Sequence, residues 1–161
     1  MGLARGSRPI RGCVAHGFSL AELIVVLGIT ATVAVTAAPT LARYWDTWSL
    51  QAGARELAST INLGRQLAIA TRTPVCVDVG STGVRFRIGG CAGDVWTGPV
   101  TDASGTIRVS DPATVAVSSN GRVVFTTLGA ASPAATYTLR HARSHASRTV
   151  VVAGSGRISV E

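Results

Sequence analysis

An uninterrupted apolar run from Phe18 to Ala38 constrains this chain more than any other feature. As a helix its 21 residues would span ~31 Å, at about 1.5 Å per residue, which matches a hydrocarbon core of about 30 Å. One ionisable side chain, Glu22, lies near its start. A charged group in lipid costs roughly 2.5 kcal/mol or more on insertion scales, so such a group usually marks a function and has a partner. The run therefore predicts a membrane-spanning helix, residues 18–38, that carries a functional carboxylate.

The residues before this run, 1–17, form a short basic leader without an acid. Its charged side chains are Arg5, Arg8 and Arg11. Positive charge before an apolar helix holds that end in the cytoplasm, so we expect the N-terminus inside and the C-terminal region outside. A secretory signal peptide has a similar design. However, Glu22 would fall inside its apolar core, and no Ala-x-Ala cleavage site follows near Pro39.

The start of the run also fits a helix-capping box. In such a box Ser19 and Glu22 satisfy each other's unpaired backbone donors, and the helix dipole favours an acid at this end. Taken alone, this structural role explains Glu22 as well as a role in assembly does. The two roles are compatible.

The junction Gly17-Phe18-Ser19-Leu20-Ala21-Glu22 resembles the processing site of type IV prepilins and of the pseudopilins of type II secretion. Four features coincide: the basic leader, the Gly-Phe junction, an acid at the fifth mature position and the unbroken apolar run. The resemblance implies that prepilin peptidase cuts between Gly17 and Phe18 and that Phe18 is N-methylated. It also implies that Glu22 pairs with the terminal amine of a neighbouring subunit, and it places Pro39 where many pilins carry a helix-bending proline.

The charge of the chain gives little support to a nucleic-acid partner. The formal net charge is +7 and every basic residue is an arginine. Without the leader, twelve arginines remain against eight acids, or +4. The mature surface is therefore only mildly basic, and a high isoelectric point alone is a weak argument for binding DNA or RNA.

Two cysteines, Cys76 and Cys91, remain after the leader and its Cys13 are removed. An even number of cysteines outside the membrane suits a disulfide. We expect a bridge between them. The alternative is two buried free thiols.

Residues 39–73 continue the helix with an amphipathic pattern. Apolar or small residues recur on one face: Leu50, Ala54, Leu57, Ile61, Gly64 and Ala68. Pro74 ends this helix, because residues before proline avoid helical geometry. Just past the membrane, Leu41, Tyr44, Trp45 and Trp48 suit either an interfacial belt or contacts with neighbouring subunits.

After Pro74 the period of the apolar residues changes to two, which predicts a β-rich region over residues 74–161. The expected strands are 75–79, 84–88, 107–109, 114–118, 122–126, 136–140, 148–153 and 157–160. Asn120-Gly121 indicates a hairpin, and residues 89–105 and 128–135 are expected to be loops. The predicted fold class is α+β: one long helix, its first half in the membrane, packed on an antiparallel sheet.

The order of these elements resembles the GspH/FimT branch of minor pilins and pseudopilins. The resemblance covers most of residues 54–160 and includes the helical segment from Arg65 to Arg72 and the terminal Gly156-Arg157 strand. It implies a structural subunit with a pilin-like fold.

No catalytic constellation is present, so we expect a protein without enzymatic activity, metal or other cofactor. His141 and His145 have a spacing that could hold zinc on a helix. They lack the Glu of a metalloprotease motif and a third ligand, and we expect a solvated pair. Gly154-Ser155-Gly156 is expected to be a turn and no nucleophile elbow.

An arginine-rich C-terminal region raises one alternative function. Arg140, Arg143, Arg148 and Arg157 could neutralise phosphates, and some members of the resembled branch bind DNA through a Gly-Arg-x-Arg element. Here Ile158-Ser159 follows Gly156-Arg157, so the second basic residue is missing. Charge that protects an edge strand from aggregation is the simpler explanation.

The leading hypothesis is a minor pilin or pseudopilin subunit of a type IV pilus or a type II secretion pseudopilus, which the sequence does not separate. Its expected partners are prepilin peptidase, other pilin or pseudopilin subunits and inner-membrane lipid. We expect a single-pass bacterial inner-membrane protein with a periplasmic C-terminal domain, which then enters the filament. The alternatives are a DNA-binding minor pilin of natural transformation, and a membrane-anchored periplasmic domain that never polymerises and uses Glu22 only as a helix cap.

Overall fold

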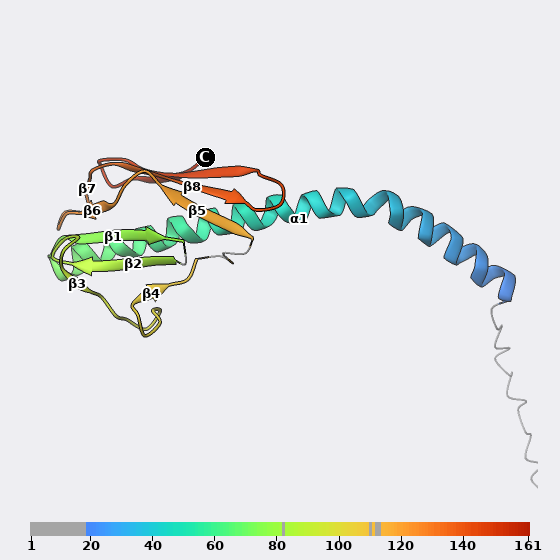
Figure 1. The fold of residues 1–161 in the computed structure, drawn as a ribbon, viewed down its shortest axis with the longest axis horizontal. Coiled ribbons are helices and arrows are strands. Elements are labelled where there is room, and N and C mark those ends of the chain that lie inside the picture. The colour runs from blue at the N-terminus through green and yellow to red at the C-terminus, as the bar shows by residue number, and fades with distance from the viewer. Residues whose placement is uncertain (1–18, 82, 110, 112–113) are drawn as a thin grey trace, which may run out of the picture. The chain divides into compact units, whose positions relative to one another are not determined.

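The computed structural model describes residues 19–81, 83–109, 111 and 114–161, and it divides into two compact units at Pro39. The described part of the first unit is the beginning of helix α1 (Leu20–Thr71). The second unit holds the rest of α1 and the strands, so the α+β prediction is confirmed (Figure 1). The strands are β1 (Val75–Gly80), β2 (Gly83–Ile88), β3 (Asp94–Val95), β4 (Thr106–Ile107), β5 (Val115–Ser119), β6 (Val123–Phe125), β7 (Ala131–Ser132), β8 (Ala135–His141), β9 (Ser147–Val152) and β10 (Ile158–Val160).

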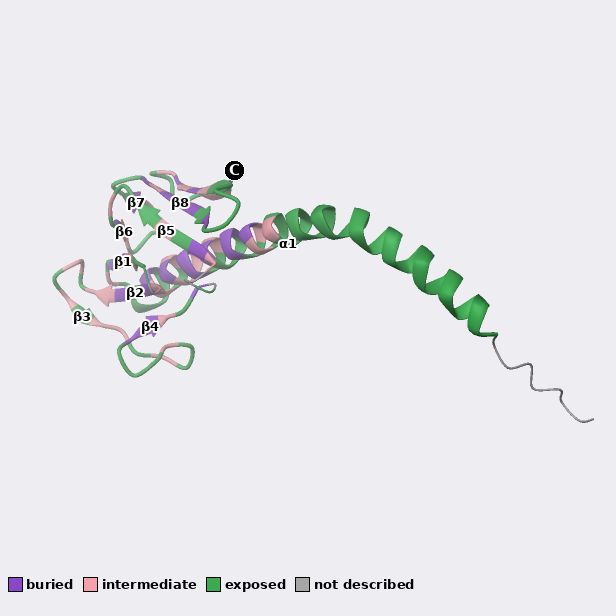
Figure 2. Cartoon of the chain, turned by 45° about the vertical axis from the view of Figure 1, so that its right-hand side comes forward, coloured by how far each residue is buried: buried purple, intermediate pink, exposed green. Residues whose placement is uncertain are grey.

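The second half of α1, from Thr40 to Thr71, which we call its outer half, is amphipathic, as the periodicity of its sequence predicts. All six residues of the predicted stripe are buried, and Gly53 and Thr60 extend the same face. Figure 2 shows these buried positions along the outer half of the helix, beside the strands. The helix ends at Thr71, and Arg72 adopts a left-handed φ of 53° before Pro74. A left-handed residue is a common way to end a helix.

The strands form two sheets where the sequence predicted one. The first sheet has the order β3-β2-β1-β6-β7 with β4 also paired to β2, and the second has the order β10-β9-β8-β5. Every pairing is antiparallel. The expected loops 89–105 and 128–135 contain the two-residue strands β3 and β7, which are too short for their alternation to be read from the sequence.

One core joins α1 to both sheets. Its largest side chains include Leu57 and Ile61 from the helix, Phe86 and Phe125 from the first sheet, and Tyr137 from the second. The helix approaches β1 and β2 very closely at Gly64. A Cβ atom added there would lie 2.9 Å from side-chain atoms of both Phe86 and Val77. Only a glycine lets the two backbones come this near.

The predicted hairpin at Asn120-Gly121 is wrong. The strands on either side, β5 and β6, belong to different sheets, because β5 pairs with β8 and β6 pairs with β1. Asn120 is held by β8: its Oδ1 accepts the Thr136 N–H at 2.8 Å, and its own N–H donates to the Thr136 carbonyl at 3.2 Å. This local bonding ends β5, and the chain then crosses to the other sheet.

Candidate functional site

The start of α1 carries the acid that the sequence singled out. The Glu22 N–H donates to Ser19 Oγ at 3.1 Å, and the Leu23 N–H donates to the Ser19 carbonyl at 3.1 Å. Ser19 is therefore the N-cap of the helix, which is the first half of the capping box that the sequence suggested. Gly17 and Phe18, together with the leader 1–17, lie outside the described residues, so the expected processing site stays a prediction.

The first unit exposes its apolar side chains. From Leu20 to Thr40 every residue of α1 is exposed, and Val35 and Leu20 retain more than three quarters of their accessible surface (Figure 2). The described residues contain one helix, α1, that is long and apolar enough to cross a membrane by length and composition. An apolar surface of this extent is unusual on a soluble monomer and marks contact with lipid or protein.

Aromatic side chains follow this segment on the same helix. Tyr44, Trp45 and Trp48 are each more than half exposed, and Leu41 lies one turn before them. The rings of Tyr44 and Trp48 stack, with centroids 6.5 Å apart and planes inclined by 14°. Such rings suit a membrane–water interface or a contact between subunits, as the sequence indicated.

The two cysteines of the second unit form the expected disulfide. Cys76 lies on β1 and is fully buried, and Cys91 lies in the loop after β2, with Cα atoms 4.9 Å apart. The N–H groups of Gly89 and Gly90 both donate to the Pro74 carbonyl, at 2.8 and 3.2 Å, so backbone bonds hold the same loop against the start of β1.

The four arginines of the DNA-binding alternative are all exposed, but the strand register separates them. Arg148 is paired with the buried Leu139, so Arg148 and Arg140 project from opposite faces of the second sheet. The N–H of Ala153 donates to the Arg157 carbonyl at 2.9 Å, which places Arg157 beside the far end of β9. At ~3.4 Å per residue, Arg157 lies roughly 17 Å along the sheet from Arg148. Arg157 therefore lies apart from the other three arginines, which are all at the end of the sheet where the chain passes from β8 to β9.

His141 is buried, and the expectation of a solvated histidine pair is wrong for it. Its Nδ1 accepts the N–H groups of Arg143 and Ser144 at 3.3 and 3.2 Å. Its Nε2 lies 3.5 Å from Oδ1 of Asp46 on α1. His145 is exposed with a left-handed φ of 56°. Within the described ranges, no group of three His, Cys, Asp or Glu side chains is placed to hold a metal ion.

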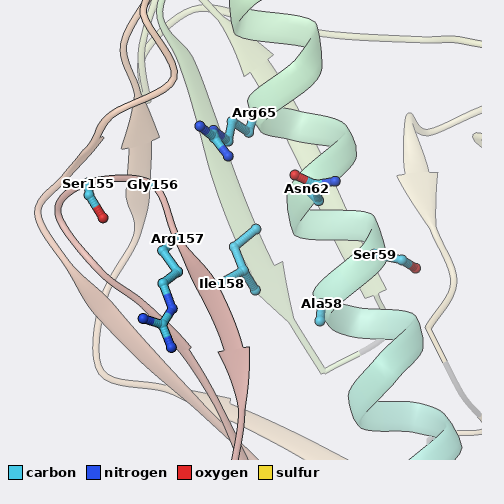
Figure 3. Close-up of a pocket in the computed structure, with 8 residues that line it drawn as sticks. All are labelled: Ala58, Ser59, Asn62, Arg65, Ser155, Gly156, Arg157 and Ile158. Atoms are coloured by element: carbon cyan, nitrogen blue, oxygen red, sulfur yellow. The ribbon is translucent and has the colours of Figure 1, made fainter.

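A groove of about 520 Å³ lies between α1 and the turn that joins β9 to β10, and sequence reasoning did not identify it (Figure 3). It is lined by Ala58, Ser59, Asn62 and Arg65 from α1 and by Ser155, Gly156, Arg157 and Ile158 from the turn and β10. The polar spacing of Ser59 and Asn62 on the helix was visible in the sequence. That they line the same groove as Arg157, about 95 residues later in the chain, depends on the tertiary fold.

Comparisons with known proteins agree with this architecture. Residues 53–156, more than half of the chain, match the family model described as "Type II transport protein GspH". The fold is similar to FimU, a type IV minor pilin of Pseudomonas aeruginosa, with a TM-score of 0.53 and 17% identity over 73% of this chain and 92% of that one. It is also similar to EpsH, a minor pseudopilin from the Type 2 Secretion System of Vibrio cholerae, with a TM-score of 0.53 and 13% identity over 70% of this chain and 96% of that one. Among curated proteins no sequence matches, and the comparisons give the DNA-binding alternative no support. Because the family model covers more than half of its length, the chain belongs to the GspH family of type II transport proteins.

Proposed function

We propose that this chain is a minor subunit of a type II secretion pseudopilus or a type IV pilus, anchored in the bacterial inner membrane by residues 18–38 before assembly. The proposal covers cleavage between Gly17 and Phe18 by prepilin peptidase, N-methylation of Phe18 and a periplasmic position of residues 74–161. Membership of the GspH family supports the subunit role.

The observation that carries the proposal is the contrast between the two units. The second half of α1 buries a full stripe of side chains in the core, whereas the first 21 residues of the helix expose their apolar side chains. A helix satisfies its own backbone hydrogen bonds and can therefore cross lipid. The same apolar surface can pack against the helices of other subunits once it leaves the bilayer.

In this proposal Glu22 has a chemical partner in the neighbouring subunit. Cleavage would create a terminal amine on Phe18, and a carboxylate attracts an amine far more strongly in a medium of low dielectric constant than in water. An unpaired Glu22 is costly in the bilayer. Stacking of subunits removes that cost by bringing the two charges together, so assembly is favoured over the isolated membrane form.

The first test measures processing. The protein is purified from membranes of cells with and without prepilin peptidase, and its N-terminal sequence and mass are determined. We expect methylated Phe18 as the first residue in the first case and the intact leader in the second. A polypeptide that still begins at Met1 in cells with an active peptidase would contradict the proposal.

The second test separates the charge of Glu22 from its role at the helix start. Glu22→Gln removes the charge and keeps a side chain suited to a capping box, whereas Glu22→Asp keeps the charge. We expect Glu22→Gln to be inserted and processed but absent from sheared filaments, and Glu22→Asp to retain part of the assembly. Normal assembly of Glu22→Gln would assign Glu22 to capping alone and favour the anchored domain that never polymerises.

A further inference from the structure

The groove between α1 and the β9–β10 turn has the composition of an anion site. Arg65 and Arg157 lie on its two sides, one on the helix and one before β10, and Asn62 adds an amide on the helix side (Figure 3). Neither guanidinium lies within 4.0 Å of a carboxylate in the part of the chain that the structure describes. No acid lines the groove.

The orientation of Arg65 is fixed before any ligand binds. Its Nε donates to the carbonyl of Gly129 at 3.0 Å, across 64 residues of sequence. Two glycines with left-handed φ values make room for this bond: a Cβ on Gly129 would lie 2.9 Å from Arg65 Nε, and one on Gly156 would collide with the Gly129 carbonyl. With Nε engaged, the two terminal nitrogens of the fork are the groups of Arg65 left to bind a ligand. A fork held in place loses less freedom when it binds.

The strand next to the groove, β10, favours a peptide as the ligand that carries the anionic group. β10 is the outer strand of its sheet and pairs on one side with β9, through the carbonyl of Arg157 and both backbone groups of Glu161. Because antiparallel residues alternate, Ile158 and Val160 direct their N–H and C=O groups to the other side. No other described strand pairs with that side. An extended segment can lie along such an edge by hydrogen bonding to its main chain.

We propose that this groove binds an aspartate or glutamate carboxylate on an extended segment of a neighbouring filament subunit. The guanidinium of Arg65 matches the planar geometry of a carboxylate, and that of Arg157 adds positive charge to the same groove. A nucleic acid would need a longer track of cations, and the other C-terminal arginines are at the far end of the sheet. The proposal rests on the subunit role proposed above.

The test uses the full-length protein in detergent micelles with ¹⁵N-labelled arginine. The probe is the peptide acetyl-Val-Thr-Asp-Thr-Val-amide, and the matched control peptide carries Asn in place of Asp. NMR records the Nε–Hε signals of Arg65 and Arg157, which are assigned from Arg65→Lys and Arg157→Gln. We expect both signals to shift with a dissociation constant on the order of 1 mM and the Asn peptide to bind at least tenfold more weakly.

Two variants locate the site. Arg157→Gln should weaken binding of the Asp peptide at least tenfold, because it removes one of the two guanidinium groups of the groove. The variant should still fold, since the Arg157 side chain is exposed. Arg148→Gln makes the same change of charge at the other end of β9 and should change the affinity less than twofold. Equal binding of the two peptides, equal loss in the two variants, or no shift at 20 mM peptide would each overturn the proposal.

A titration with inorganic phosphate tests whether the groove prefers a free anion to a carboxylate on a peptide. Tighter binding of phosphate than of the Asp peptide would overturn the assignment to a protein carboxylate. The outcome is separable from the proposed function: a protein that enters filaments but ignores the peptide refutes the groove alone, whereas a protein that never enters filaments refutes the subunit role whatever the titration gives.

Discussion

The disulfide between Cys76 and Cys91 gives the sharpest prediction about stability. The bridge closes a loop of 16 residues, counting both cysteines. In the chain-entropy model a closed loop of this size stabilises the folded state by about 3 kcal/mol, because it removes freedom from the unfolded chain. For a unit of roughly 120 residues this corresponds to a fall in Tm of about 12 °C on reduction.

The measurement compares the oxidised protein with the same protein in a phosphine reductant, by urea unfolding of the full chain in detergent. Reduction is the cleanest perturbation because both sulfur atoms stay in place. Cys91→Ala removes the bridge at a partly exposed position and should match reduction. Cys76→Ala also leaves a cavity at a fully buried position, so it should cost roughly 1 kcal/mol more.

The dependence on denaturant checks the mechanism. If the bridge acts on the unfolded chain, reduction should raise the m-value, because the unlinked chain exposes more surface when it unfolds. A loss below about 1 kcal/mol on reduction, with an unchanged m-value, would refute the reasoning from loop entropy.

Three further perturbations test polar groups of the second unit. The Tyr137 hydroxyl is buried without a partner among the described residues, so Tyr137→Phe should leave the free energy of unfolding unchanged or raise it by up to about 1 kcal/mol. Burial raises the Tyr137 pKa to about 12, so the wild type should lose stability above pH 10 while Tyr137→Phe lacks this loss. Hydrogen bonds from Ser104 and Thr106 lower the pKa of the exposed Asp102 carboxyl below its ordinary 3.8. The protection of the Ser104 and Thr106 amides from hydrogen exchange should therefore be complete above pH 3.8 and should fall as the pH drops through the lowered pKa of Asp102. The variant Asp102→Asn should show no such change with pH. His141→Ala strands two backbone donors and should cost about 1–3 kcal/mol in urea unfolding, whereas His145→Ala, at an exposed site, should change stability by less than about 0.5 kcal/mol.

Local patterns in the sequence predicted the parts of the fold that depend on near neighbours. The stripe from Leu50 to Ala68 repeats with the helical period, and the alternation of Val75, Val77 and Val79 repeats with the period of a strand. The helix buries this stripe and the strand buries Val75 and Val77, so the spacing of the apolar residues reports the structure of each element directly. The helix and the β1–β2 hairpin follow from these patterns alone.

Contacts between distant segments were not predictable in this way. Asn-Gly is a strong local hairpin signal, yet at Asn120 the bonds to Thr136 on another strand decide the path of the chain. The contact of His141 with Asp46 joins segments 95 residues apart, and nothing in either local sequence indicates it. The placement of Arg140 and Arg148 on opposite faces likewise depends on the register of β8 with β9.

The missing side chain at Gly64 has a mechanical consequence. With α1 resting directly on Phe86 and Val77, no flexible layer separates the helix from the first sheet, and close-packed interiors transmit strain with little compliance. Sliding α1 along its axis by one turn would bring a larger side chain of the same face, Ile61 or Ala68, into that contact. A force along the axis of the second half of α1 is therefore transmitted directly to the strands of the first sheet.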